Sequence, residues 1–285
     1  METLQLSVGI KDVKGDIHKT LPIYRGGSEI EKIYTGDKST ASLYTWFADV
    51  ICASISYIGD EPIAEPFLTS MAKGKRVHSE LILKLPLSEV GNLLVQIQRE
   101  CWQDIIKDQQ TLCKWCGDQI TIPEVDLNKI TIPVLETGYP EFITVDISNT
   151  KMETSGIEAI KELSGQVFNR MSFSLPTLGD AIRHESVGAD DILFWRKIAN
   201  DCLRQIEYAP VSPEDPLSAQ IFNKQYISLR GTLIMSRDLN TKDLKKVRDR
   251  LQNALPSANM YYDDTCPCPK KRTMPYFVVP GDFFS

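Results

Sequence analysis

The sequence predicts an α+β protein of mixed helices and short antiparallel strands. Three observations support this class. Apolar residues recur at helical spacing in several segments, alternating strand-like segments lie between them, and prolines and glycines divide the strand-like pieces. The 285 residues, 42% hydrophobic and 25% charged, are enough for two domains or for one domain with insertions. Because the net charge is −6, the overall composition gives no support for a nucleic-acid-binding surface.

Five segments have the apolar periodicity of helices. They run from Ser39 or Thr40 to Gly59, from Ser88 to about Asp108, from Gly156 to Phe168, from Asp190 to Glu207, and from Thr241 to Leu255. In the last segment basic residues alternate with aspartates, which predicts a solvated face with ion pairs.

Strands are expected between these helices. The residues from Val77 to Leu85 alternate in the manner of a strand with one mostly apolar face. Further strand-like pieces occupy residues 119–122, 130–135, 142–147, 172–175 and 226–235. Residues 1–37 are expected to be irregular or to form short strands, since glycines and charges interrupt every periodic pattern there.

The order of these elements suggests three regions. Residues 1–75 form an N-terminal helical or irregular region, and residues 76–208 contain a strand, a helix and a cysteine turn. Residues 209–285 carry a strand, a helix and a tail rich in cysteine and aromatic residues, which we expect to pack with the middle region. The prolines that follow Tyr208 predict a loop or linker between the second and third regions.

The main chemical feature is the turn Cys113-Lys114-Trp115-Cys116-Gly117. Two thiolates at this spacing can bind one tetrahedral metal ion, and the glycine lets the chain fold back around it. The only other close pair is Cys266 and Cys268, so the sequence predicts a structural zinc site formed by Cys113, Cys116, Cys266 and Cys268. Such a site would clamp the middle of the chain to its C-terminal part.

Two other interpretations of these cysteines stay open. In the first, the four cysteines are reduced thiols that bind no metal. In the second, Cys113 and Cys116 form a redox pair, although such pairs usually lie between a strand and a helix, and that setting is not predicted here. Cys52, Cys101 and Cys202 fall on apolar helical stripes and are expected in the core. Seven cysteines and an N-terminus without a signal-like segment predict a reducing compartment.

No catalytic constellation is predicted. The histidines are His18, His78 and His184, and none lies beside a nucleophile motif. His184 follows Asp180 by four residues, which predicts a local hydrogen-bonded pair. The longest apolar stretch, Leu43 to Ile58, contains Asp49 and is too short and too polar to cross a bilayer. We therefore expect no enzyme and no membrane protein, with an enzyme of unrecognised site as an open alternative.

The order of several motifs resembles the baseplate hub and tail-assembly proteins of contractile-tailed bacteriophages over residues 76–285. The resemblance rests on the cysteine turn, the following Val125-Asp126-Leu127-Asn128-Lys129-Ile130, the segment Leu175-Pro176-Thr177-Leu178-Gly179-Asp180, a late helix, the second cysteine pair and the terminal Phe283-Phe284.

This resemblance implies a non-enzymatic structural or assembly component of a tail baseplate, in its hub or wedge region or as its assembly factor. Its partners would be other baseplate or tail proteins. It would be made in the host cytoplasm and could then join the virion tail. A zinc-stabilised cytoplasmic adaptor of an unrelated complex is the alternative, and homo-oligomerisation is open in both cases. The aromatic tail would pack on the protein's own body or on a partner.

Overall fold

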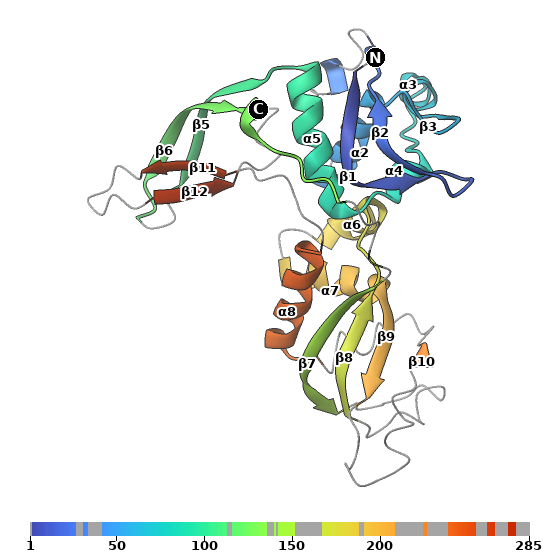
Figure 1. The fold of residues 1–285 in the computed structure, drawn as a ribbon, viewed down its shortest axis with the longest axis vertical. Helices are drawn as coiled ribbons and strands as arrows, with labels where there is room; N and C mark the ends of the chain where they lie inside the picture. Colours follow the sequence, from blue (N-terminus) through green and yellow to red (C-terminus); the bar gives the residue numbers. More distant parts are fainter. Residues whose placement is uncertain are drawn as a thin grey trace. The chain divides into compact units, whose positions relative to one another are not determined.

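The computed structural model describes residues 2–26, 31–33, 42–112, 116–135, 140, 142–151, 167–187, 191–208, 225–226, 239–254, 261–265 and 273–277 (Figure 1). The helices and antiparallel strands confirm the α+β class. The chain forms two compact units. One contains Met1–Gly138 and Pro256–Ser285, and the other contains Tyr139–Leu255.

The first unit begins with an antiparallel hairpin of β1 (Thr3–Lys11) and β2 (Ile17–Pro22). The helices α2 (Leu43–Ser54), α3 (Ala64–Ala72), α4 (Glu80–Leu83) and α5 (Leu87–Cys101) follow, with a two-residue hairpin of β3 (Tyr57–Ile58) and β4 (Glu61–Pro62) after α2. Two more hairpins belong to this unit: β5 (Ile105–Leu112) with β6 (Gln119–Asp126), and β11 (Tyr261–Thr265) with β12 (Thr273–Phe277). The short helix η1 (Leu127–Lys129) follows β6.

Helix α5 lies along β1 and bonds to it through side chains (Figure 1). Gln96 Oε1 accepts a hydrogen bond from the Gln5 N–H at 2.7 Å, and Gln96 Nε2 donates to the Gln5 carbonyl at 2.7 Å. The buried Glu89 carboxylate accepts bonds from the N–H groups of Ser7 and Val8, at 3.1 and 2.8 Å. Because Glu89 and Gln96 are seven residues apart, they lie on one helix face, and that face satisfies strand groups that would otherwise lack partners.

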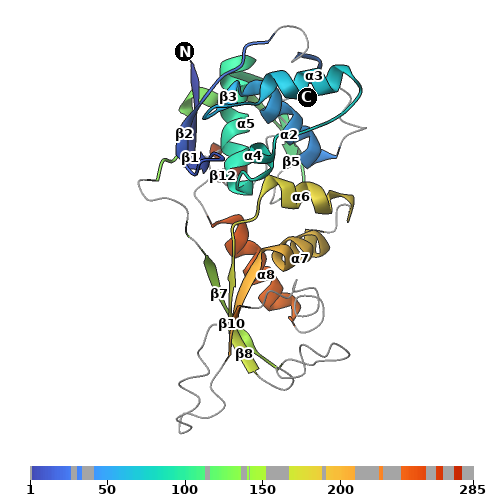
Figure 2. The same ribbon diagram turned by 90° about the vertical axis from the view of Figure 1, so that its right-hand side faces the viewer.

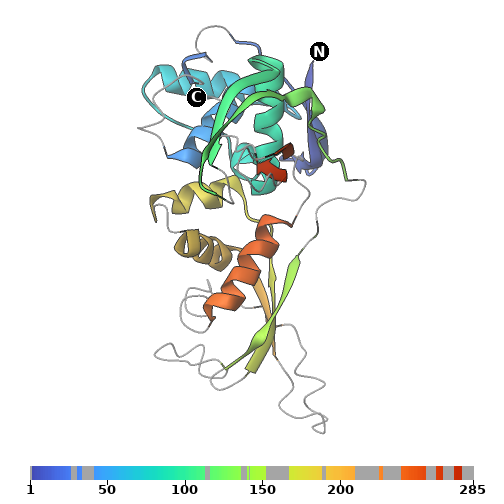
Figure 3. The ribbon, with the colours of Figure 1, turned by 90° about the vertical axis from the view of Figure 1, so that its left-hand side faces the viewer.

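The second unit has a four-stranded antiparallel sheet in the order β10-β9-β8-β7. Its strands are β7 (Ile143–Lys151), β8 (Val167–Phe173), β9 (Leu203–Tyr208) and β10 (Gln225–Tyr226). Its helices are α6 (Leu178–His184), η3 (Glu185–Val187), α7 (Asp191–Cys202) and α8 (Thr241–Gln252). Figures 2 and 3 show α7 and α8 on the same side of this sheet.

An apolar core fills the space between the sheet and these helices. Helix α8 packs on β7 and on α7. The strands contribute alternating buried residues, and each of the two helices contributes one stripe. The buried residues are Ile143, Val145, Ile147, Met171, Phe173 and Leu203 from the sheet, Phe194, Trp195, Ile198 and Ala199 from α7, and Leu244, Val247 and Leu251 from α8. The unit is therefore a two-layer sandwich.

Four of the expected helices are confirmed in position with changed ends, namely α2, α5, α7 and α8. Helix α2 is shorter than expected, since it begins after Ser42 and ends at Ser54. The cap of α8 is Asn240, whose side chain accepts a bond from the Asp243 N–H at 2.9 Å. The expected ion pairs are present on α8, with Lys246 Nζ 3.1 Å from Asp243 Oδ1, but Asp243 is buried and does not belong to a solvated face.

One prediction for the middle of the chain is wrong, and another is wrong only at the end of its helix. The strand expected from Val77 to Leu85 is instead the helix α4, which Ser79 caps by accepting a bond from the Leu81 N–H at 3.2 Å. The helix expected from Ser88 to about Asp108 ends at Cys101, and β5 begins at Ile105. In both places the apolar residues fit the helical period as well as the two-residue period of a strand, so tertiary packing decides which structure forms.

Two further predictions are corrected in the second unit, and one in the first unit is narrowed. The helix expected from Asp190 to Glu207 ends at Cys202, where β9 continues the chain into the sheet. Most of the helix expected from Gly156 lies outside the described residues, and its last two positions belong to β8. Of the two structures expected for residues 1–37, irregular chain or short strands, the N-terminal part forms strands, and β1 is nine residues long.

The two units divide the chain differently from the three expected regions. The expected boundary after residue 75 lies inside the first unit, because α5 packs on both β1 and α2. The expected boundary after residue 208 lies inside the second unit, because β9 and β10 pair in one sheet and α8 packs on β7.

Candidate functional site

Each predicted cysteine pair lies in the connection of an antiparallel hairpin. The β5–β6 hairpin closes with Leu112 opposite Gln119, so its connection is residues 113–118 and contains Cys113 and Cys116. The β11–β12 hairpin closes with Thr265 opposite Thr273, so its connection is residues 266–272 and contains Cys266 and Cys268. Both hairpins belong to the first unit. Sequence analysis predicted neither pair to lie between two strands.

Part of the first connection is described. Cys116 is exposed, and Gly117, the next residue, has φ +75°, a conformation that glycine adopts more readily than other residues. A Cβ atom at Gly117 would meet nothing within 4 Å, so backbone conformation, and not lack of space, favours glycine here. This agrees with the expected role of the glycine in turning the chain after the second cysteine.

Cys113, Cys266 and Cys268 lie outside the described residues. Across the part of the chain that is described, no group of three or more His, Cys, Asp or Glu side chains is arranged to hold a metal ion.

The charges of the two connections fit a four-thiolate zinc site. Zinc with four thiolates carries a charge of −2, which nearby cations stabilise. The second connection contains Lys270, Lys271 and Arg272, and the first contains Lys114 and Asp118. Together the two connections hold four basic and one acidic side chain in sequence, a net +3, which is opposite in sign to the charge of such a metal centre.

Two of the other three cysteines are core residues, as expected. Cys52 and Cys202 are buried, and burial raises the pKa of each thiol to about 12. Cys101, at the end of α5, is half-buried. A thiol with so high a pKa is almost entirely protonated at neutral pH and is neither a nucleophile nor a metal ligand.

His78 joins a polar cluster around the buried Asp49 that the sequence did not reveal. Its Nε2 atom lies 2.7 Å from Asp49 Oδ1, and Arg76 Nε lies 3.2 Å from Asp49 Oδ2. The His78 ring also stacks on Phe67, with ring centroids 5.6 Å apart. Asp49 is buried in α2, so these contacts fasten the segment before α4 to that helix.

His184 was expected to pair with Asp180, but it pairs with Asp201 instead. The His184 Nε2 atom lies 2.9 Å from Asp201 Oδ2, which joins α6 to α7. Asp180 instead forms a capping box with Thr177 at the start of α6, accepting bonds from the Thr177 N–H and hydroxyl at 2.9 and 2.8 Å. A carboxylate used in this way fixes a helix start.

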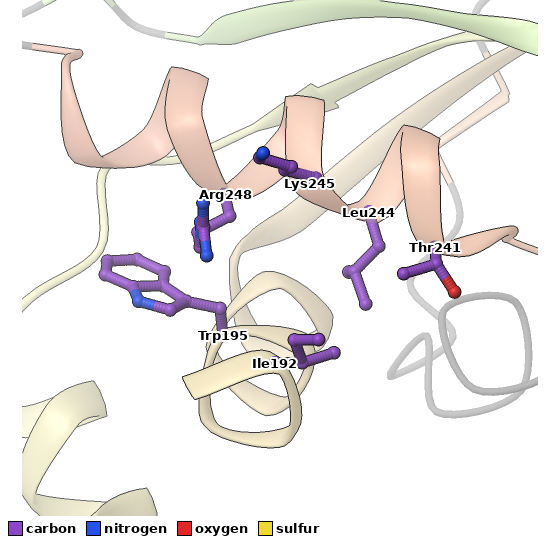
Figure 4. A pocket seen from close by; sticks show the side chains of 6 residues that line it. All are labelled: Ile192, Trp195, Thr241, Leu244, Lys245 and Arg248. Carbon is purple, nitrogen blue, oxygen red and sulfur yellow. The ribbon is translucent and has the colours of Figure 1, made fainter. Parts of the chain in front are cut away.

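A small pocket lies between α7 and α8 in the second unit (Figure 4). Its volume is about 70 Å³, and it is lined by Ile192, Trp195, Thr241, Leu244, Lys245 and Arg248. Sequence analysis missed it, although a signal exists. Residues 192–195 are four consecutive apolar residues, more than the buried stripe of a single helix can hold.

The comparisons with protein families, curated proteins and solved structures give no match for this chain. Among the helices that the structure describes, none has the length and hydrophobicity needed to span a membrane.

Proposed function

We propose that the protein is a non-enzymatic assembly component in which a zinc ion joins two β-hairpins that are far apart in the sequence. The metal ligands are Cys113, Cys116, Cys266 and Cys268. We further propose that the assembly is a contractile-tail baseplate, the setting that the sequence resemblance implies, with other baseplate or tail proteins as partners.

The observation that carries the zinc clamp is the position of each cysteine pair in the connection of a hairpin. Zinc-ribbon sites are built in this way, with two close thiolates from each of two turns completing a tetrahedron. About 150 residues separate the two pairs along the chain. Bringing them together would fix one hairpin against the other and close a very long loop.

The ligand set supports a structural role for the metal. Catalytic zinc sites keep one position open for water or substrate, whereas four cysteine ligands fill the coordination shell. The zinc ion would then supply folding free energy, on the order of 10 kcal/mol for small structural sites. A rigid pair of hairpins is a suitable platform for protein contacts.

Elemental analysis of the purified chain tests the clamp. We expect one zinc per chain, and Cys116→Ser should lower both the zinc content and the melting temperature severely. Cys101→Ser is the matched control, because Cys101 belongs to neither pair, and it should retain the metal. A chain without zinc, or a Cys116→Ser variant with an unchanged melting temperature, would show that the thiols are unligated.

A genetic experiment tests the proposed setting. In a phage that carries this gene, an amber mutation should stop assembly of complete baseplates while heads still form, as seen by electron microscopy. Wild-type protein supplied in trans should restore tails, and the Cys116→Ser variant should not. Normal contractile tails from the amber mutant would refute the baseplate role and would leave the adaptor of an unrelated complex as the function to test.

A further inference from the structure

The pocket between α7 and α8 combines an apolar floor with a basic rim. Trp195 and Leu244 are buried beneath it, whereas the Ile192 side chain at its edge is 47% exposed. Lys245 and Arg248 line it from α8 (Figure 4). The exposed Leu193 extends the apolar surface beside Ile192 along α7.

The size of this pocket limits what can enter it. Cavities that hold small-molecule ligands and cofactors measure roughly 300–1,000 Å³, and this one measures about 70 Å³. Its volume accommodates one aliphatic or aromatic side chain. Peptide segments that bind in a groove on a partner protein insert apolar anchor side chains of this kind.

The charge of α8 indicates what should flank that anchor. The helix Thr241–Gln252 contains five basic and two acidic side chains, a net +3, in a chain whose net charge is −6. Arg248 is bonded to Asp249, with Arg248 Nη2 2.9 Å from Asp249 Oδ1. Lys245 is exposed, and within the described part of the chain it has no ion-pair partner. An acidic group beside the anchor would complement this rim.

We propose that this pocket binds a peptide segment of a partner protein in which one large apolar side chain is flanked by carboxylates. The apolar side chain enters between Ile192, Trp195 and Leu244, and a carboxylate pairs with Lys245. This inference rests on the proposed assembly function, since it names the chemistry of one partner contact.

A random twelve-residue peptide library displayed on filamentous phage tests the proposal, with the full-length protein as the bait. We expect enriched peptides to share an acidic residue next to a large apolar one. A synthetic peptide of the enriched sequence should bind at least about fivefold more weakly to Lys245→Glu. Arg250→Glu is the matched control, because it makes the same charge change at an exposed position of α8 that does not line the pocket.

A second pair of measurements separates the apolar and ionic contributions. Ile192→Asp should weaken binding of the same peptide, because it places a charge at the exposed edge of the apolar floor. Raising the salt concentration to about 1 M should weaken binding to the wild type, whereas it should not weaken binding to Lys245→Glu, where salt screens a repulsion instead of an attraction. No enrichment, enrichment of basic or uncharged peptides, or binding that both pocket variants retain would overturn the proposal.

The failure of this inference is distinguishable from the failure of the zinc clamp. A chain that contains zinc but selects no acidic peptide would overturn the pocket assignment alone. A zinc-free chain that selects such peptides would overturn the clamp alone.

Discussion

Replacing Glu89 by alanine would break the main polar connection between α5 and β1. The Glu89 side chain is buried and accepts three hydrogen bonds, from the N–H groups of Ser7 and Val8 and from Asn92 Nδ2 at 3.0 Å. Alanine removes the acceptor and leaves two backbone donors buried in the structure. The space left by the lost side chain adds a packing cost.

The expected loss can be worked from these bonds. A hydrogen bond to a charged group contributes about 1.5–3 kcal/mol, and breaking a buried charged network costs about 3–5 kcal/mol. We therefore expect Glu89→Ala to lower the free energy of unfolding by about 4 kcal/mol. Glu89→Gln should cost about 2 kcal/mol, because the amide keeps one acceptor oxygen but turns a donor toward one of the strand N–H groups.

Urea unfolding followed by circular dichroism measures both values. With an m value of about 2 kcal/mol/M, a loss of about 4 kcal/mol moves the unfolding midpoint of the first unit by roughly 2 M. Glu100→Ala is the control on the same helix. Its partner is the neighbouring Arg99 at 2.8 Å near the surface, so its effect should stay below about 1 kcal/mol. A Glu89→Ala variant that loses less than about 1 kcal/mol would refute the view that the carboxylate supports β1.

Three further predictions concern the first unit. Gly59→Ala should cost about 2 kcal/mol in urea unfolding, because Gly59 has φ +59° and a new Cβ would lie 2.6 Å from Asp12 Oδ2. Gly74→Ala, at φ +70° with nothing within 4 Å of the new Cβ, should cost only about 1 kcal/mol, and equal losses would contradict the steric argument. The hydrogen bond from His18 lowers the Asp12 pKa below its ordinary value of 3.8. The stability that the Asp12–His18 hydrogen bond contributes is therefore complete above pH 3.8. It is lost as the pH falls through the pKa of Asp12 in the folded protein. Consequently the stability difference between wild type and Asp12→Asn should shrink below about pH 4, and a pH-independent difference would argue against the pairing. Cys52 should not react with Ellman's reagent at pH 8 in the native protein and should react in urea, since burial raises its pKa to about 12.

The sequence alone determined the class of the fold and the positions of its long amphipathic helices. The stripes of α2, α5 and α8 were readable because helical periodicity extends over three or more turns in each. The ion pairs on α8 followed from local spacing, and the buried Cys52 and Cys202 followed from their places on apolar stripes. These features depend on residues close together in the chain.

Short apolar runs were decided by tertiary packing. The residues of α4 alternate in sequence like a strand, yet one helical turn buries Leu81 and Ile82 after the Ser79 cap. The residues of β9 continue the apolar pattern of α7, but they form a strand that pairs with β8. Over four to eight residues both periods fit, so neighbouring elements make the choice.

For the candidate sites too, local sequence predicted some features and tertiary structure decided the others. The cysteine spacing pointed to a metal site, but only the strand pairing shows that both pairs lie in hairpin connections. Only the position of β1 shows that Glu89 and Gln96 on α5 bond to the backbone of that strand. The pocket between α7 and α8 needs two helices that are separated by about forty residues. Contacts between distant segments carry no signature in local periodicity, and for this reason the tertiary structure alone decided them.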